Sequence, residues 1–315
     1  MRFAIIGLGI QGRKRRNVAG SNAVVSIDPI VGGADFQQIT EVNPETFDAA
    51  CVCVPDNQKV QLLEQLLSKR KHVMVEKPLL GSPAQIKELI RLARTNNTTC
   101  YTAYNHRFEP HIVNLKRIVD SNALGQIYLA KFFYGNGTAR DVRNSPWRDN
   151  GLGVLSDLGS HLIDIAHFLF GPHKSKGELW AWNRFENNAP DHVLFGYRGS
   201  PDLEMEATFL SWRNSFRIDL FGELGSAHID GLCKWGPSTL RLRKRRFPSG
   251  VPKESVEVIE ARDPTWQLEH DYFIQLCRST GCNLVNDLWI NEKLHELSFP
   301  LNGSVHDHQL GNQTN

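Results

Sequence analysis

Through the first 103 residues, short apolar runs typical of strands alternate with segments whose apolar residues recur at helical spacing. Residues 49–54, AACVCV, form a wholly apolar run that Pro55 stops, which is typical of a parallel strand buried on both faces. Residues 57–71 and 83–96 carry apolar side chains at helical spacing, and a strand-like run at 72–76 lies between them. Strand and helix in strict turn, joined by short connections, predict a doubly wound parallel sheet.

The rest of the chain has longer strand candidates separated by polar turns. They predict one open, mostly antiparallel sheet, interrupted by a helix at 154–170 and followed by two helices at 266–278 and 286–297. We therefore expect an α/β fold: a Rossmann domain at 1–108, an α+β domain at 109–302 whose last helices can pack back on the first domain, and a disordered tail at 303–315. The expected strands are 126–134, 178–185, 192–197, 203–210, 216–221 and 226–229.

Composition narrows the class of protein. The 315 residues include 41% hydrophobic residues, 16 Phe and 7 Trp, enough apolar surface for a large core. The formal net charge of +2 argues against nucleic acid or an anionic membrane as a partner, and the basic run at 241–246 is interpreted as an exposed strand or loop, with a polyanion site as the alternative.

The sequence also bears on location and metal binding. No apolar run approaches the ~20 residues that span a bilayer, and the opening lacks the charge order of a secretory signal, so we expect a cytoplasmic protein. The six cysteines have no metal-ligand spacing, so no metal is expected.

The motif Gly7-Leu8-Gly9-Ile10-Gln11-Gly12 follows the first expected strand and opens the first helix. There Gly7 permits a tight turn, Gly9 lets the backbone approach a pyrophosphate, and Gly12 lets helix and strand pack closely. The helix N-terminus, at Ile10 and Gln11, adds partial positive charge. The motif predicts a dinucleotide site; a glycine turn with a purely steric role is the alternative.

Asp28 ends the second expected strand, where an acid accepts hydrogen bonds from the ribose hydroxyls of NAD and repels the extra phosphate of NADP. Asp before Pro29 also favours a turn in any protein. The run Arg13-Lys14-Arg15-Arg16 can offer an arginine to that phosphate, although such a run is more often a solvated helix face. NAD(H) is favoured and NADP(H) is the alternative. The other residues placed in the cofactor site are Val54, Pro55, Asn57, Glu76 and Lys77.

Two further motifs suggest catalytic side chains. Glu76-Lys77-Pro78 stands at the carboxyl end of an expected strand, where Lys77 can polarise a substrate oxygen. Asp157 and His161 are four residues apart on the expected helix, which places them on one face, and Asp164 continues it. A neutral His161 can take the proton of a substrate hydroxyl as hydride leaves the same carbon, with Asp157 positioning the proton-transfer network. A surface lysine and an ordinary salt-bridge pair are the alternatives.

Together these motifs resemble the glucose-fructose oxidoreductase, inositol dehydrogenase and MocA family, from residue 1 to about 290. The resemblance implies a Rossmann domain followed by an open α/β domain whose sheet often forms a dimer or tetramer contact. It also implies that Lys77 is the catalytic lysine, that Asp157 and His161 are the paired residues of the second domain, that Asn105 contacts substrate, and that Arg107 is structural. The motifs are residues 7–12, 76–78, 104–108, 153–164 and 266–273.

The chain departs from that family between Asp28 and Phe47. Relatives usually place a further helix and strand there, whereas this chain offers a short polar stretch, so we expect a trimmed Rossmann sheet. A second distinctive segment, 134–149, mixes small, amide, cationic and aromatic residues that suit a polyol. We expect Trp147 and Arg148 to contact substrate there, with an ordinary turn as the alternative.

The favoured hypothesis is an NAD(P)-dependent oxidoreductase that moves hydride between nicotinamide and a secondary alcohol of a sugar, sugar derivative or cyclitol. The alternative is a nucleotide-sensing regulatory protein of the same fold without catalysis. A small polyol or sugar is the expected partner, together with a second copy of the chain in a homodimer or homotetramer; nucleic acid and membrane are not expected.

Overall fold

A computed structural model describes residues 1–279 and 281–298, which fall into two compact units. Unit 1 comprises Met1–Asn105 and Pro264–Asn291, and unit 2 comprises His106–Asp263 and the described residues from Glu292 onward. The expected tail at 303–315 lies outside the described residues. Within those described ranges, no helix is both long and apolar enough to cross a membrane.

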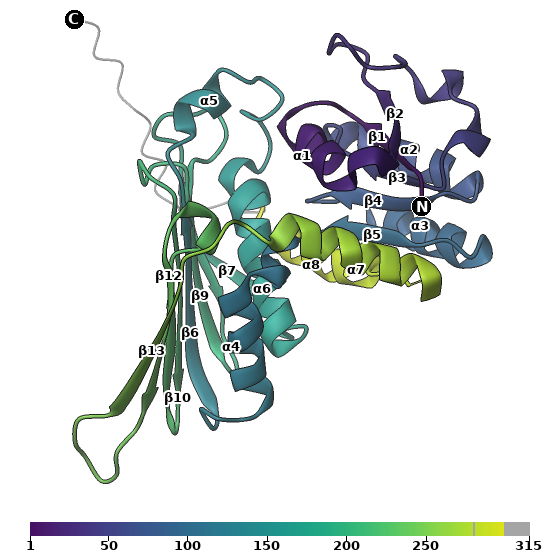
Figure 1. The fold of residues 1–315 in the computed structure, drawn as a ribbon. Helices are drawn as coiled ribbons and strands as arrows, with labels where there is room; N and C mark the ends of the chain where they lie inside the picture. The colour runs from purple at the N-terminus through teal and green to yellow at the C-terminus, as the bar shows by residue number, and fades with distance from the viewer. Residues whose placement is uncertain (280, 299–315) are drawn as a thin grey trace, which may run out of the picture. The chain divides into compact units, whose positions relative to one another are not determined.

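Unit 1 is built on a five-stranded parallel sheet in the order β2-β1-β3-β4-β5 (Figure 1). The predicted doubly wound sheet is therefore confirmed. Its elements are β1 (Phe3–Ile6), α1 (Ile10–Ala19), β2 (Ala23–Ile27), β3 (Ala49–Val52), α2 (Asp56–Ser68), β4 (His72–Glu76), α3 (Pro83–Thr95), β5 (Cys100–Ala103), α7 (Thr265–Ser279) and α8 (Leu284–Leu297), the last of which ends in unit 2.

Both faces of this sheet are buried, which explains its wholly apolar strands. Ala4 and Ile6 of β1 join a core with α2 and α3, whereas Phe3 and Ile5 join a second core with α1 and α7. Successive side chains of one strand point to opposite faces of the sheet, so a single apolar run contributes to both cores.

The sheet of unit 1 is short at one edge, as the sequence predicts. β2 is the edge strand, and residues 29–47 contain only the 3-10 turns Ile39–Glu41 and Pro44–Thr46 and an isolated bridge from Phe36 to Ile27. Asp35 ties this loop down, because its carboxylate accepts hydrogen bonds from the N–H and hydroxyl of Ser26.

Unit 2 is built on an eight-stranded sheet in the order β13-β12-β11-β10-β6-β9-β8-β7. All neighbouring pairs are antiparallel except β6 with β9, which confirms a mostly antiparallel sheet. Its elements are α4 (Pro110–Asp120), β6 (Ile127–Gly135), α5 (Ala139–Arg143), α6 (Ser160–Phe170), β7 (Gly177–Asn183), β8 (His192–Tyr197), β9 (Asp202–Thr208), β10 (Ser215–Gly222), β11 (Gly225–Asp230), β12 (Ser238–Lys244) and β13 (Lys253–Ile259).

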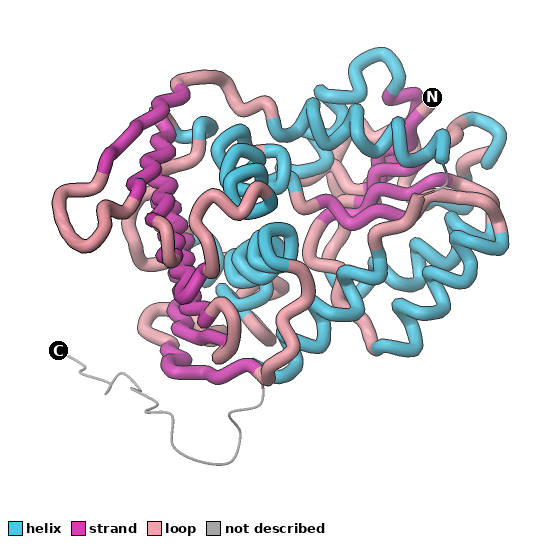
Figure 2. Tube along the Cα trace, turned by 90° about the horizontal axis from the view of Figure 1, so that it is seen from below, coloured by secondary structure: helices cyan, strands magenta, loops and turns pink. Residues whose placement is uncertain are grey.

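One face of this sheet packs against α4 and α6, and the other carries no helix in the described chain (Figures 1 and 2). Along β9 the side chains of Leu203 and Met205 are buried, whereas Glu204 and Glu206 alternate with them toward the outer face. This period of two is typical of a sheet covered on one side.

The structure of unit 2 differs in part from the expected elements. The strand β13 and the helices α4 and α5 have no counterpart among the expected elements, whereas β12 overlaps the basic run at 241–246 that was interpreted as a strand or loop. The expected helix at 154–170 opens with a π-helical turn, Leu155–Gly159, before α6 begins. The basic run at 241–246 is strand and then loop, as expected, but only its residues 244–246 are exposed; Arg241 and Arg243 of β12 are half-buried and pair with Glu254 of β13.

Candidate functional site

The glycine turn after β1 has the geometry of a tight crossing between strand and helix. Gly7 has a φ of +89°, and its N–H donates to the carbonyl of Ile27 at 2.8 Å. A Cβ on Gly12 would lie 1.7 Å from the carbonyl oxygen of Gly7. Gly7 and Gly12 therefore allow α1 to start directly against the strand end.

Gly9 faces open space. A Cβ there would have no described atom within 4 Å, and no side chain of the described residues caps α1, which has no acidic residue in its first turn. The backbone N–H groups at the start of a helix can donate hydrogen bonds to phosphate oxygens. Because Gly9 has no Cβ, a phosphate can approach the backbone closely there. The residues present therefore fit a dinucleotide pyrophosphate at Gly9, Ile10 and Gln11.

Asp28 supports the same turn from β2. Its Oδ2 accepts from the N–H of Leu8 at 2.7 Å, and its Oδ1 accepts from the N–H groups of Ile30 and Val31 at 2.8 Å. Burial acts to raise the pKa of Asp28, but the three backbone hydrogen bonds outweigh it and hold the pKa below its ordinary value. Asp28 thus stabilises a turn, which is the alternative role considered for it in the sequence analysis. Its contact with a ribose stays a prediction.

The remaining cofactor candidates of unit 1 follow the carboxyl ends of neighbouring parallel strands. Val54 and Pro55 lie between β3 and α2 and are half-buried, Asn57 is exposed in the first turn of α2, and Glu76 ends β4. Because Gly7 and Asp28 follow β1 and β2, these residues share one edge of the sheet, where doubly wound folds bind ligands.

The structure corrects the interpretation of Arg15, which is buried with 1% of its surface exposed and does not belong to a solvated helix face. Its Nε donates to Glu76 and its Nη2 to Glu269 of α7, both at 2.7 Å, and its guanidinium lies over the Trp266 ring. Arg15 shares the inward face of α1 with Gly12 and Ala19, which explains its burial.

Lys77 is half-buried immediately after β4, in a segment that neighbouring elements fix. The Nζ of Lys59 donates to the carbonyls of Glu76 and Pro78, and Asn291 of α8 accepts from Gly81 and donates to Leu79. Asn105 follows β5 and donates from its side-chain amide to the hydroxyl of Thr265 at 2.8 Å. These residues all belong to unit 1.

The second catalytic candidates lie in unit 2, within one turn of each other. Asp157 is in the π-helical turn and His161 is in the first turn of α6, where its ring is buried. A π-helical turn often marks a functional position in a helix. His161 stacks on His106 with ring centroids 4.0 Å apart and planes inclined by 18°, and Tyr134 of β6 lies 5.8 Å away.

The imidazole of His106 has a defined hydrogen-bonding role. Its Nε2 lies 2.9 Å from the Nζ of Lys234, a contact in which Nε2 is the acceptor when Lys234 carries its ammonium charge. Sequence reasoning missed both residues. His106 stands inside the motif at 104–108, whereas Lys234 has no local signal because it lies 128 residues along the chain.

Arg148 is the substrate candidate that the structure brings to Asp157, at 3.3 Å between Nη2 and Oδ2, with both side chains partly exposed. Trp147 beside it is 62% exposed. Asp149 holds the end of this loop, because its carboxylate accepts from the side chain of Asn188 and the N–H of Ala189.

Arg107 and Asp164 form a two-pronged ion pair in unit 2. Arg107 Nε lies 2.8 Å from Oδ2 and Nη2 lies 2.6 Å from Oδ1 of Asp164, which is buried in α6. Burial raises the pKa of Asp164, and the guanidinium opposes this rise. Burial also lowers the pKa of nearby His167 to about 4.

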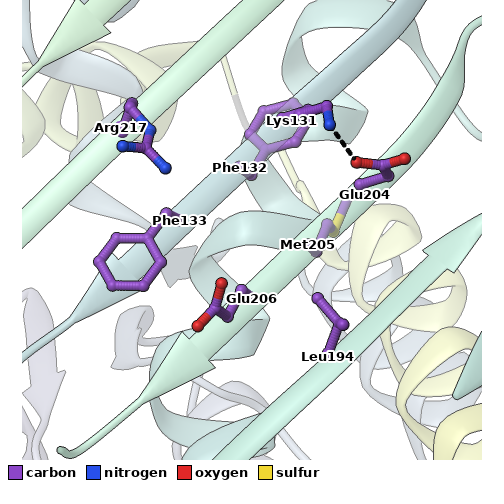
Figure 3. A pocket seen from close by; sticks show the side chains of 8 residues that line it. All are labelled: Lys131, Phe132, Phe133, Leu194, Glu204, Met205, Glu206 and Arg217. Carbon is purple, nitrogen blue, oxygen red and sulfur yellow. Dashed lines mark ion pairs between the residues drawn. The ribbon is translucent and has the colours of Figure 1, made fainter. Parts of the chain in front are cut away.

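A shallow cavity of about 220 Å³ lies elsewhere, on the helix-free face of the sheet in unit 2 (Figure 3). Lys131 of β6 and Glu204 of β9 form an ion pair of 2.8 Å across it. None of the candidate site residues lines this cavity. Its lining residues are Lys131, Phe132, Phe133, Leu194, Glu204, Met205, Glu206 and Arg217.

Two family models match the chain. The model described as the oxidoreductase family with an NAD-binding Rossmann fold matches residues 30–104. The model of the GFO/IDH/MocA C-terminal domain matches residues 112–228.

Curated relatives match part of their length. The uncharacterized oxidoreductase C26H5.09c of Schizosaccharomyces pombe is 33% identical over 137 residues, which are 42% of this chain and 37% of that protein. The trans-1,2-dihydrobenzene-1,2-diol dehydrogenase of Oryctolagus cuniculus is 28% identical over 205 residues, which are 64% of this chain and 60% of that protein. The chain thus spans less than two thirds of the length of these relatives.

A solved structure shares the fold over nearly the whole chain. Levoglucosan dehydrogenase in complex with NADH and levoglucosan has a TM-score of 0.79 at 16% identity, covering 95% of this chain and 97% of that one. The order of the strands, the glycine turn and the two matching models agree. The chain belongs to the Gfo/Idh/MocA family of oxidoreductases.

Proposed function

We propose that this chain is an NAD(P)-dependent dehydrogenase or reductase that acts on a secondary alcohol or ketone of a sugar, sugar derivative or cyclitol. The glycine turn is the observation that carries the proposal, because it leaves open space at Gly9 beside an uncapped helix start in the described chain. The printed names of related proteins support the substrate class: one is a dihydrodiol dehydrogenase and another a levoglucosan dehydrogenase.

In this proposal Lys77, Asp157 and His161 serve one hydroxyl group. When bound, the nicotinamide supplies or accepts hydride at its C4. In the oxidation direction His161 takes the hydroxyl proton, Lys77 stabilises the developing alkoxide, and Asp157 orients the proton-transfer network; in reduction the roles reverse. Asn105, Trp147 and Arg148 bind further hydroxyls of the substrate.

NAD(H) is the proposed cofactor, with NADP(H) as the alternative. Asp28 uses three of the roughly four acceptor positions of its carboxylate on backbone N–H groups, so one position is left for a ribose hydroxyl. Its negative charge also opposes a phosphate at that place. Fluorescence titration with NADH and NADPH measures the preference.

The proposed function is tested by incubating the protein with NADH and a panel of keto-sugars and ketocyclitols while following the loss of NADH absorbance. In the reverse direction, NAD⁺ is combined with levoglucosan, myo-inositol or trans-1,2-dihydrobenzene-1,2-diol. Turnover that is lost in Lys77→Met supports the proposal. Tight NADH binding without turnover on any substrate supports the alternative, a nucleotide-sensing regulatory protein.

We also propose that the chain forms a homodimer or homotetramer through the sheet of unit 2. The support is its helix-free face, where the aromatic side chain of Phe133 lies among the charged side chains of Lys131, Glu206 and Arg217 (Figure 3). Light scattering of the purified protein tests this, and a monomer at micromolar concentration would contradict it.

A further inference from the structure

Lys59 is a buried lysine in the first turns of α2, with 2% of its surface exposed. Its ammonium has three N–H donors, and the structure gives each a partner. Nζ lies 2.7 Å from the carbonyl oxygen of Glu76, 2.8 Å from that of Pro78 and 2.7 Å from Oδ1 of Asp56. The hydrogen-bonding capacity of this ammonium is therefore filled.

The two carbonyl oxygens belong to the residues on either side of Lys77. One hydrogen bond fixes the peptide unit that enters Lys77, and the other fixes the carbonyl of the next residue. Burying an ammonium is costly even when it is paired, and an apolar side chain of similar length would fill the same volume without that cost. The specific contribution of Lys59 is thus the pair of hydrogen bonds that it donates to these two carbonyls.

Other contacts hold the same segment from different elements. Arg15 of α1 binds the side chain of Glu76, and Asn291 of α8 binds the backbone of Leu79 and Gly81. Lys59 alone among these residues binds the backbone on both sides of Lys77. All of these groups belong to unit 1, so the arrangement does not depend on unit 2.

We propose that Lys59 is a positioning residue that fixes the backbone of Lys77 and thereby the place of its ammonium. The inference rests on the proposed function, in which Lys77 stabilises the alkoxide. A misplacement of about 1 Å at a reacting group can lower turnover about 10²-fold, so a clamp on both flanking carbonyls affects rate more than substrate affinity.

Lys71 provides a matched control in the same unit. It is also buried, with 9% of its surface exposed, and its Nζ donates to one backbone carbonyl, that of Phe47, at 3.0 Å. It precedes β4, whereas Lys77 follows this strand. Replacing Lys71 removes a comparable buried ammonium without touching the segment around Lys77.

The first experiment measures backbone hydrogen exchange by mass spectrometry in wild type, Lys59→Met and Lys71→Met. We expect Lys59→Met to raise exchange in peptides covering residues 75–82 by about tenfold or more, because freed carbonyls let this segment open. Lys71→Met should leave those peptides at wild-type rates. Wild-type exchange over 75–82 in a folded Lys59→Met would overturn the proposal.

Lys59→Gln is the second variant, because it keeps N–H donors without the charge. We expect it to give an intermediate rise in exchange. If both Lys59 variants unfold while Lys71→Met remains folded, Lys59 serves the fold as a whole and the positioning role is refuted.

The second experiment uses a substrate found in the NADH panel. We expect Lys59→Met to lower kcat about 10- to 100-fold, with the Kd for NADH unchanged and KM little changed, and Lys71→Met to retain wild-type kcat. An unchanged kcat in Lys59→Met, in an enzyme that Lys77→Met inactivates, would overturn the proposal. The exchange experiment needs no turnover, so a failure of the proposed function is distinguishable from a failure of this inference.

Discussion

Arg15 and Glu269 form an ion pair of 2.7 Å across 254 residues of sequence, with side chains 1% and 0% exposed. Glu76 shares the same guanidinium, so one cation serves two buried carboxylates. Burial raises the pKa of Glu269 to about 7, although Arg15 opposes the rise.

This pKa predicts a pH-dependent stability. The unfolded chain loses the Glu269 proton near its ordinary value of 4.5, whereas the folded chain keeps it until about 7. The stabilisation is therefore complete below pH 4.5 and is lost as the pH rises to about 7. In urea unfolding at pH 5, 6, 7 and 8, the free energy of unfolding of wild type should fall by up to about 3 kcal/mol relative to that of Glu269→Gln as the pH rises. A constant difference across this range would show that Glu269 stays ionised.

Gly9 and Gly12 are expected to respond in opposite ways to alanine. Gly9 has an extended backbone and open space at its Cβ position, so Gly9→Ala should fold with stability within about 0.5 kcal/mol of wild type but bind NADH at least about tenfold more weakly. In Gly12→Ala the new Cβ would meet the backbone of Gly7, which should cost about 3 kcal/mol or more. Thermal melts and NADH titrations test both variants; Gly9→Ala with wild-type affinity would move the pyrophosphate elsewhere.

Asp28→Asn should destabilise unit 1 by about 1–3 kcal/mol, since an amide cannot accept all three backbone hydrogen bonds. The lowered pKa of Asp28 gives a stabilisation that is present above its ordinary value of 3.8 and is lost as the pH falls through the folded value. Acid unfolding should therefore affect wild type more steeply than Asp28→Asn. If the variant keeps full stability and loses only NADH affinity, the residue acts on the ribose alone.

The pair of Arg107 and Asp164 predicts a large cost for removing one partner. Arg107→Met leaves a buried carboxylate without this cation and should lower the free energy of unfolding by about 3–5 kcal/mol, whereas Arg107→Met with Asp164→Leu should recover most of it. Arg91→Met is the control, because its pair with Glu88 is exposed to solvent and should contribute little to the free energy of unfolding. Equal effects of Arg107→Met and Arg91→Met in urea unfolding would contradict this account.

The elements that can be predicted from the sequence are those whose side chains are all buried. The strands of unit 1 lie between two cores, so their residues are apolar and easily identified. β13 was missed because nearly all its side chains are exposed at the sheet edge, and charged residues alternate with valine there. β12 carries the same mixture of Leu240 and Leu242 with arginines.

The candidate site divides in the same way. The glycine turn is a local motif, so its place after β1 follows from the sequence. Arg15 is buried because it pairs with Glu269, and Lys59 donates hydrogen bonds to the carbonyls of Glu76 and Pro78. These partners lie in other elements of the chain, so the local sequence around each basic residue does not predict them.

The most direct test of the proposed chemistry compares wild type with His161→Asn in a single turnover, in which NADH reduces a keto-sugar or ketocyclitol found in the substrate panel. The account predicts a rate about 10² to 10⁴ times lower in the variant, with NADH affinity unchanged, because His161 moves the proton and does not hold the cofactor. A variant that oxidises NADH as fast as wild type would contradict it.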